Sequence, residues 1–362
     1  MSVYLYTGGY KTVAKSGVGK ALEHQRAALQ AAGVPLLEKL PPAGPEAQNC
    51  IVHLNTVLPD SLWTAAKAHA RGCKVVYYGH STMQDFRNSF RGSNLLASLF
   101  KRWLQHCYRQ GDILITPSVY SRNILQGYDL NVPIYALSNG INTDFFRPST
   151  TRAARFRVRY ALKEGQKCAI SVGHWMVRKG LPDFVELARR MPEVRFLWFG
   201  QTDSALLTPE VRQAMRSAPA NLTFAGFADP ETLCDAYCGA DAFAFLSHEE
   251  TEGIVVLEAL ACGTPTLVRD IPVYRDWLAN GISVYKEATL DGFETTLRQM
   301  LDGTLPSLAA GGRAVAEARS LKAIGEGLRA IYADAGFPVQ ADTAPPYSPV
   351  CPAPNGGSLN GR

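Results

Sequence analysis

Short apolar segments alternate with stretches of helical periodicity along most of the chain. Runs rich in Val, Ile and aromatic residues predict strands at 3–6, 51–54, 75–78, 113–116 and 134–136, and then at 168–172, 195–199, 222–225, 242–245, 266–268 and 283–285. Apolar residues at 3–4-residue spacing predict helices between them, among them 21–32, 61–71, 95–108, 181–190 and 255–262. Because continuous apolar strands that alternate with helices are typical of parallel sheets covered on both faces, we expect an α/β fold.

Two blocks of this pattern meet at a turn-like patch at residues 147–150. The chain has 362 residues, which suits two domains of about 150 residues each. We therefore predict two Rossmann-like, doubly wound domains, at 1–148 and 149–336. Ligands of such sheets bind beyond the carboxyl ends of the strands, so two facing sheets would enclose a cleft. Residues 337–362 contain six Pro and three Gly and predict a disordered tail.

Several classes of protein disagree with the composition. The sequence contains no run of 18 apolar residues, which argues against a membrane-spanning helix, and its first residues lack the basic-then-apolar pattern of a signal peptide. The eight Cys are scattered, and Cys234 and Cys238 form the only close pair, with no second pair to complete a zinc site. We expect reduced thiols, a cytoplasmic protein and no metal site.

The charge differs between the two halves. Residues 1–148 hold 15 Lys and Arg against 8 Asp and Glu, whereas residues 149–362 hold 22 against 24. A basic first half indicates an anionic surface as its partner, either nucleic acid or a membrane. Basic motifs with interleaved aromatic residues are absent, which disfavours a nucleic-acid-binding protein but leaves it as the non-enzymatic alternative.

The segment 247–265 is the most informative part of the chain. It predicts a strand end, an acidic loop, a glycine and a buried helix that Gly263 and Pro265 close. Glu258 falls on the apolar helix, where an unpaired carboxylate would be costly. The loop carboxylates suit a hydroxyl-rich ligand, and the amides that open the helix, at Gly253, Ile254 and Val255, suit a phosphate. We interpret Glu249 and Glu252 as solvated side chains that favour the helix dipole.

The spacing Glu250-x7-Glu258, followed by Ala-Leu-Ala-Cys-Gly-Thr-Pro, resembles the signature of retaining glycosyltransferase family 4, whose fold is GT-B. The fuller wording, Glu-Glu-Thr-Glu-Gly-Ile-Val-Val-Leu-Glu-Ala-Leu-Ala, resembles the bacterial subgroup that makes glycosyl-diacylglycerols, notably its diglycosyl-diacylglycerol synthases. Further stretches that resemble this subgroup lie at 15–21, 79–82, 85–90, 138–141, 178–180, 191–200 and 269–274.

The resemblance implies roles for individual second-domain residues. Glu258 matches the carboxylate that binds the ribose hydroxyls of the donor, and Glu250 the one that contacts the donor sugar. Lys179 matches the lysine that neutralises the donor diphosphate. Family members often carry Gly-Arg after the preceding strand, where this chain has His174, so Arg178 or His174 is expected to supply the second cation.

In the first half, the resemblance implies that the loop with Gly17 and Gly19 closes on the donor phosphates. Glycines at a helix start let the backbone amides approach an anion. His80, after the strand at 75–78, matches a histidine near the reacting sugar. Arg87 is expected to face the acceptor or a phosphate.

The expected reaction is transfer of glucose or galactose from a UDP-sugar to a monoglycosyl-diacylglycerol, with retention. In the route implied, the departing diphosphate takes the proton of the acceptor hydroxyl, and neither a cofactor nor a metal is required. Alternatives within enzymes are the first glycosylation of diacylglycerol, or a polysaccharide or other lipid-linked acceptor. A catalytically inactive binding protein is disfavoured because Lys179, Glu250 and Glu258 are all present.

The helix predicted at 95–108 combines an apolar stripe with cations. Lys101, Arg102 and Trp103 belong to it, and two interpretations stay open: a core-packed helix with a solvated face, or a helix in the headgroup region of an anionic membrane. The suspected lipid acceptor favours the second, and with it a peripheral protein on the inner face of the cell membrane. The oligomeric state is not readable from the sequence.

Overall fold

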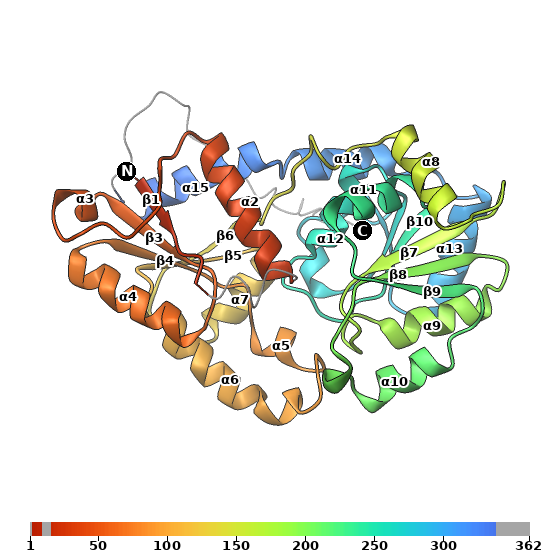
Figure 1. Cartoon of the computed structure of the whole chain (residues 1–362), viewed down its shortest axis with the longest axis horizontal. Coiled ribbons are helices and arrows are strands. Elements are labelled where there is room, and N and C mark those ends of the chain that lie inside the picture. Colours follow the sequence, from red (N-terminus) through yellow and green to blue (C-terminus); the bar gives the residue numbers. More distant parts are fainter. Residues whose placement is uncertain (1, 9–15, 338–362) are drawn as a thin grey trace, which may run out of the picture.

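The computed structural model describes residues 2–8 and 16–337, which form two parallel six-stranded sheets lying side by side (Figure 1). The first sheet has the order β2-β1-β3-β4-β5-β6 and the second the order β12-β11-β10-β7-β8-β9. The strands of the first are β1 (Ser2–Leu5), β2 (Leu36–Leu37), β3 (Cys50–Leu54), β4 (Lys74–Tyr78), β5 (Ile113–Thr116) and β6 (Ile134–Ala136). Those of the second are β7 (Cys168–Val172), β8 (Arg195–Phe199), β9 (Leu222–Gly226), β10 (Ala242–Phe245), β11 (Thr266–Arg269) and β12 (Tyr285–Glu287).

Helices cover both faces of the first sheet. The long ones are α2 (Gly17–Ala31), α4 (Pro59–Arg71), α6 (Ser93–Tyr108) and α7 (Val119–Gln126), with one-turn helices α3 (Pro45–Gln48) and α5 (Met83–Phe86). Ala65 of α4 and Leu104 of α6 are buried in one apolar cluster against the sheet. Leu29 of α2 is buried in the other, on the opposite face.

The second sheet is covered in the same way. Its helices are α8 (Thr150–Arg159), α9 (Leu181–Arg190), α10 (Pro209–Arg216), α11 (Pro230–Gly239), α12 (Ile254–Ala261), α13 (Leu290–Asp302) and α14 (Ala309–Glu317), with 3-10 turns η1 (Ser204–Leu206) and η2 (Pro272–Tyr274). Helices α8, α11 and α12 pack on one face and α9, α10 and α13 on the other. The predicted α/β class with two doubly wound sheets is confirmed.

The last described helix, α15 (Leu321–Asp334), returns to the first sheet (Figure 1). Leu328 and Tyr332 are buried with Leu29 of α2, and the Tyr332 hydroxyl hydrogen-bonds His53 of β3. The sequence placed this segment in the second domain because it follows that domain along the chain, and this placement is corrected. Of the predicted tail, Phe337 is buried in the same cluster, and 338–362 lie outside the described residues.

Both sheets reverse their strand order at one point, which prepares a binding crevice. In the first sheet the reversal lies between β1 and β3, and in the second between β7 and β10. Open α/β sheets bind ligands at such points, beyond the carboxyl ends of the strands. The loops after β7 and β10 are those that carry Lys179 and Glu250.

Candidate active site

Lys179 and Glu250 meet at the switch point of the second sheet. The Lys179 ammonium forms an ion pair with the Glu250 carboxylate, which also accepts a hydrogen bond from the Ser247 hydroxyl at 2.7 Å. The chain can turn there because Gly180 has φ +75°, and a Cβ at this position would lie 2.2 Å from the Leu246 carbonyl oxygen. Only glycine therefore lets the loop after β7 pass this close to the end of β10.

The electrostatics of this pair reflect its burial. Burial lowers the pKa of Lys179, and the charge of Glu250 acts against this effect. Burial alone would raise the pKa of Glu250, but the charges of Lys179 and Arg178 outweigh it and lower that pKa. Both partners are mutually charge-stabilised, so a buried cation stands ready at the end of the crevice.

Arg178 connects the two domains. Its guanidinium lies 2.9 Å from the Asp85 carboxylate of α5, donates to the Ser89 hydroxyl at 3.0 Å and donates to the Glu249 carbonyl oxygen at 2.8 Å. The side chain is buried. Arg178 thus belongs to the same charged cluster as Lys179 but spends its hydrogen bonds on protein partners.

Glu258 lies on the buried helix α12 and has two partners. Its Oε1 atom lies 2.6 Å from the Lys20 ammonium of α2, and its Oε2 atom accepts from the Tyr237 hydroxyl of α11 at 2.9 Å. The carboxylate is 1% exposed and Lys20 is 28% exposed. Each carboxylate oxygen can accept a second hydrogen bond. The pair thereby fixes the orientation of a group that still has capacity for a ligand diol.

The start of α12 presents backbone amides beside these carboxylates. Gly253 precedes the helix with φ +97°, and a Cβ there would lie 3.0 Å from the Tyr274 hydroxyl oxygen. Ile254 and Val255 form the first turn, whose N–H groups have no partner within an α-helix. These amides can bind an anion, as the sequence predicts for them.

The first domain places its candidates around the other switch point. Gly17 is the first residue of α2 and is exposed, whereas Gly19 is buried; part of the preceding loop, residues 9–15, lies outside the described residues. His80 follows β4, stacks on Tyr78 and hydrogen-bonds Asn55 Oδ1 through Nε2 at 2.9 Å.

The His80 ring is neutral at pH 7. Burial lowers the pKa of His80 to about 4. Because Asn55 Nδ2 donates to Gln25, its Oδ1 atom faces His80 and can only accept. The His80 Nε2 atom therefore carries the proton, and Nδ1 is the acceptor of the ring.

Two family models match the chain: Glycosyl transferases group 1 over residues 153–310, and Glycosyltransferase Family 4 over residues 45–145. The chain is 36% identical over 333 residues to the processive diacylglycerol alpha-glucosyltransferase of Acholeplasma laidlawii, a match that covers 92% of this chain and 98% of that relative. The chain belongs to glycosyltransferase family 4. The alpha-galactosylglucosyldiacylglycerol synthase of Streptococcus pneumoniae is 25% identical over 62% of this chain and 61% of its own length.

Solved structures agree with the fold of this family 4 chain. Anabaena HepE, in complex with UDP and glucose, superposes with a TM-score of 0.72 at 14% identity, over 91% of this chain and 98% of that one. At this identity the likeness shows the fold alone, which is GT-B. The fold predicted from the resemblance is thus confirmed, and the residue roles stay predictions.

Two acidic residues of the loop before α12 are not solvated as expected. Glu252 is 2% exposed and accepts hydrogen bonds from the backbone and side chain of Asn139, at 3.1 and 2.7 Å. Glu249 accepts from the Tyr120 hydroxyl of α7 at 2.9 Å, and burial raises the pKa of Glu249 to about 7. Both side chains contact the first domain across the cleft, a tertiary effect that the local sequence does not contain.

The remaining predicted residues fall near the edge of the cleft. His174 pairs through Nδ1 with the Gln201 carbonyl oxygen, so Arg178 is the better placed of the two candidate cations beside Lys179. Arg87 is exposed at the end of α5. On α6, Arg102 is exposed, Lys101 lies over the Tyr128 ring at 4.7 Å and Trp103 donates to the Val57 carbonyl oxygen at 2.7 Å.

The apolar stripe of α6 divides along its length. Its C-terminal half is core, with Leu104 and Tyr108 fully buried. Its N-terminal half is open: Leu95 is 89%, Leu96 46% and Leu99 65% exposed. Both interpretations of this helix therefore hold, each for one half. Over the described residues, no helix combines the length and the apolar character that crossing a bilayer requires.

Sequence reasoning missed four residues of the site: Lys20, Tyr237, Asp85 and His24. The first three pair with predicted residues, and His24 is held by the Gly140 carbonyl oxygen at 2.8 Å near Lys20 and Glu258. Lys20 alone had a local signal, because it directly follows the glycine-rich turn. The other three lie within ordinary helical patterns.

Proposed function

We propose that this protein transfers a hexose from UDP-glucose or UDP-galactose to a diacylglycerol-type glycolipid, with retention of the anomeric configuration. The observation that supports this most strongly is the buried Lys179–Glu250 pair, which lies at the same switch point as the start of α12. The relatives, named as glucosyl- and galactosyl-diacylglycerol synthases, support the acceptor class.

The donor would span the switch point of the second sheet. Glu258, held by Lys20 and Tyr237, suits the two ribose hydroxyls because a carboxylate accepts both at once. The amides at the start of α12, with Lys179, suit the diphosphate. Glu250 would accept from sugar hydroxyls, and the Nδ1 atom of the neutral His80 ring would accept another.

The chemical step divides into one bond broken and one formed. The bond between the anomeric carbon and the diphosphate oxygen breaks, and the acceptor oxygen bonds to the same face of that carbon. The acceptor proton passes to the departing diphosphate. Lys179 and the helix amides stabilise the charge that grows on this leaving group, which is the enzyme's main contribution together with orientation. No cofactor has a part in this step.

The acceptor would enter from the side of α6. A cleft lies between residues 88–94, which lead into this helix, and Val177 with residues 208–210 of the second domain. The backbone N–H of Arg178 donates to the Asn88 carbonyl oxygen, so this cleft adjoins the charged cluster. The exposed Leu95 and Leu99 follow the cleft directly along the chain.

We propose accordingly that the N-terminal half of α6 lies in the headgroup region of an anionic membrane at the inner face of the cell. Three exposed leucines on one helical end are costly in water and favourable among acyl chains. Arg91 and Arg102, both exposed, would meet anionic headgroups at about 1 kcal/mol each.

The acceptor is tested by a grid of purified enzyme with UDP-glucose or UDP-galactose and vesicles that contain diacylglycerol or monoglucosyl-diacylglycerol. Diglycosyl product from the second acceptor supports the second step, and monoglycosyl product from the first supports the initial step. The relative is named processive, so both products from one enzyme remain within the proposal. Sugar transfer to neither lipid would overturn the proposed acceptor class.

Membrane binding is tested by vesicle co-sedimentation of a Leu95→Ser/Leu99→Ser variant. The matched control is Val158→Ser/Ile282→Ser, which removes two comparably exposed apolar side chains, at 82% and 67%, from the second domain. We expect the first variant to lose anionic-vesicle binding at least about tenfold and the control to bind as the wild type. Equal loss in both variants would show that α6 is not the contact.

A further inference from the structure

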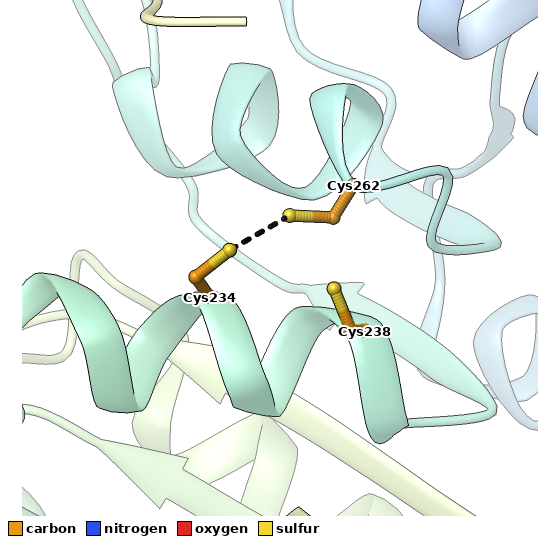
Figure 2. Close-up of side chains that lie close together, drawn as sticks. All are labelled: Cys234, Cys238 and Cys262. Carbon is orange, nitrogen blue, oxygen red and sulfur yellow. Dashed lines mark hydrogen bonds between the residues drawn. The ribbon is translucent and has the colours of Figure 1, made fainter. Parts of the chain in front are cut away.

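Three of the cysteines converge at one place behind the donor site. Cys234 and Cys238 lie one turn apart on α11, and Cys262 is the residue that ends α12 (Figure 2). Their Sγ atoms all lie within 4.8 Å of one another, and those of Cys234 and Cys262 are 3.7 Å apart. The sequence showed only the first two as a pair and predicted no metal site, because Cys262 is distant along the chain.

This spacing is the one that a metal ion imposes on thiolates. A tetrahedral ion with metal–sulfur bonds of about 2.3 Å holds its sulfurs roughly 3.8 Å apart. The Cys234–Cys262 distance already has this value, and only a small rotation of Cys238 is needed to complete a three-sulfur face. Cys50 and Cys73, by contrast, hydrogen-bond only as a pair.

The surroundings supply access and further oxygen atoms. Cys234 and Cys262 are buried, whereas Cys238 is half-buried and gives solvent a route to the cluster. The carbonyl oxygens of Phe145 and Arg147 lie 3.5 Å from Cys234 Sγ and 3.3 Å from Cys238 Sγ. Over the part of the chain that the structure describes, these three thiols are the group with metal-ligand spacing.

We propose that Cys234, Cys238 and Cys262 bind one soft metal ion, Zn²⁺ or Cu⁺, as three thiolates. Thiolates select these ions over hard cations, and the three thiol protons pass to solvent on binding. Water or a carbonyl oxygen of the segment 145–147 completes the coordination of Zn²⁺, while Cu⁺ needs only the three sulfurs.

The position of the cluster gives the ion a structural role at the donor site. Helix α11 carries Tyr237 between the two cysteines, and α12 carries Glu258 one turn before Cys262. The ion would join these helices beneath the hydrogen bond from Tyr237 to Glu258. It also joins both helices to the segment that connects the two domains, since that segment supplies Phe145 and Arg147.

Metal retention by the full chain tests this proposal. The reduced protein is stripped with a chelator, incubated with Zn²⁺ or Cd²⁺, passed through gel filtration and analysed for metal per chain and for the thiolate charge-transfer absorption of Cd²⁺. We expect the wild type to retain about one ion and to melt at a higher temperature with it. Cys238→Ser and Cys262→Ser should bind at least about tenfold more weakly.

Cys107→Ser is the matched control, because Cys107 is a buried thiol that donates to the Val57 carbonyl oxygen, much as Cys234 donates to that of Phe145. It should retain metal as the wild type does. Cys238→Ser, at the half-buried position, decides the outcome if Cys262→Ser does not fold. Retention that is absent in the wild type, or equal in Cys238→Ser, overturns the proposal. So does a Cys234–Cys262 disulfide with no metal uptake. Since metal retention is measured without substrate, it stands or falls separately from the transfer reaction.

Discussion

Replacement of Lys20 by Met removes the positive partner of a carboxylate that is 1% exposed. At 2.6 Å and an effective dielectric constant of about 20, the Coulomb attraction is about 6 kcal/mol, and desolvation of both groups cancels most of it. The Tyr237 hydroxyl still donates to Glu258 in the variant, and Lys20 is partly open to water. We therefore expect a net loss of about 1–3 kcal/mol, the usual cost of one charge-assisted hydrogen bond.

The assay is a double-mutant cycle with Glu258→Gln, measured as donor KM and as free energy of unfolding in urea. If Lys20 acts through Glu258, the two changes are not additive, and the coupling free energy is about 1–3 kcal/mol. Donor KM should rise about tenfold in Lys20→Met while kcat changes little, because Lys20 orients a ribose-binding group. Lys20→Arg should keep most of the function.

The matched control is Lys67→Met on α4, an exposed lysine of the same domain, which should change neither quantity. A coupling free energy near zero, with wild-type donor KM in Lys20→Met, would refute the positioning role. It would mean that the ion pair contributes nothing beyond what water supplies in its absence.

Three further predictions follow from single contacts. Lys179→Met should lower kcat by roughly 10²–10³-fold, the cost of removing one group that stabilises growing charge, and a wild-type kcat would remove Lys179 from the mechanism. Since burial raises the pKa of Glu249 to about 7 from its usual 4.5, the folded chain retains a proton that the unfolded chain releases in this window, so the contribution of Glu249 to stability falls as the pH rises from 4.5 to 7. Melting temperatures of Glu249→Gln relative to wild type should accordingly be higher at pH 8 than at pH 5, and an equal difference at both would contradict the assignment. Tyr332→Phe removes the hydroxyl that pairs with the buried His53 and should cost about 1–3 kcal/mol in urea unfolding, whereas Tyr135→Phe, which loses only a bond to Asp334 at the surface, should cost less; equal losses would count against the docking of α15.

The features that the sequence predicted are those encoded locally. Apolar strands separated by helices specify two parallel sheets, and the loops after β7 and β10 place Lys179 and Glu250 at one switch point whatever their other partners are. The Glu250–Glu258 spacing also lies within one loop and helix. Such signals need no knowledge of which segments pack together.

The features that it missed depend on contacts between distant segments. Lys20 and Glu258 are 238 residues apart, and Tyr332 and His53 are 279 apart. No periodicity in either segment specifies such a partner. Glu252 was interpreted as solvated because its neighbours are acidic, but Asn139 of the other domain buries it. The docking of α15 on the first sheet was missed for the same reason, since its pattern shows an apolar face without its target.

The measurement that tests the account most directly is the anomeric configuration of the lipid product. Wild type and Lys179→Met are each incubated with UDP-glucose or UDP-galactose and vesicles of monoglucosyl-diacylglycerol in anionic lipid, and the glycolipid is characterised by mass and NMR. The account predicts one added hexose in the α configuration of the donor, formed by the wild type and nearly absent with Lys179→Met. A β-linked product would contradict retention. No added hexose from either donor, with a folded protein that binds the vesicles, would contradict the proposed transfer itself.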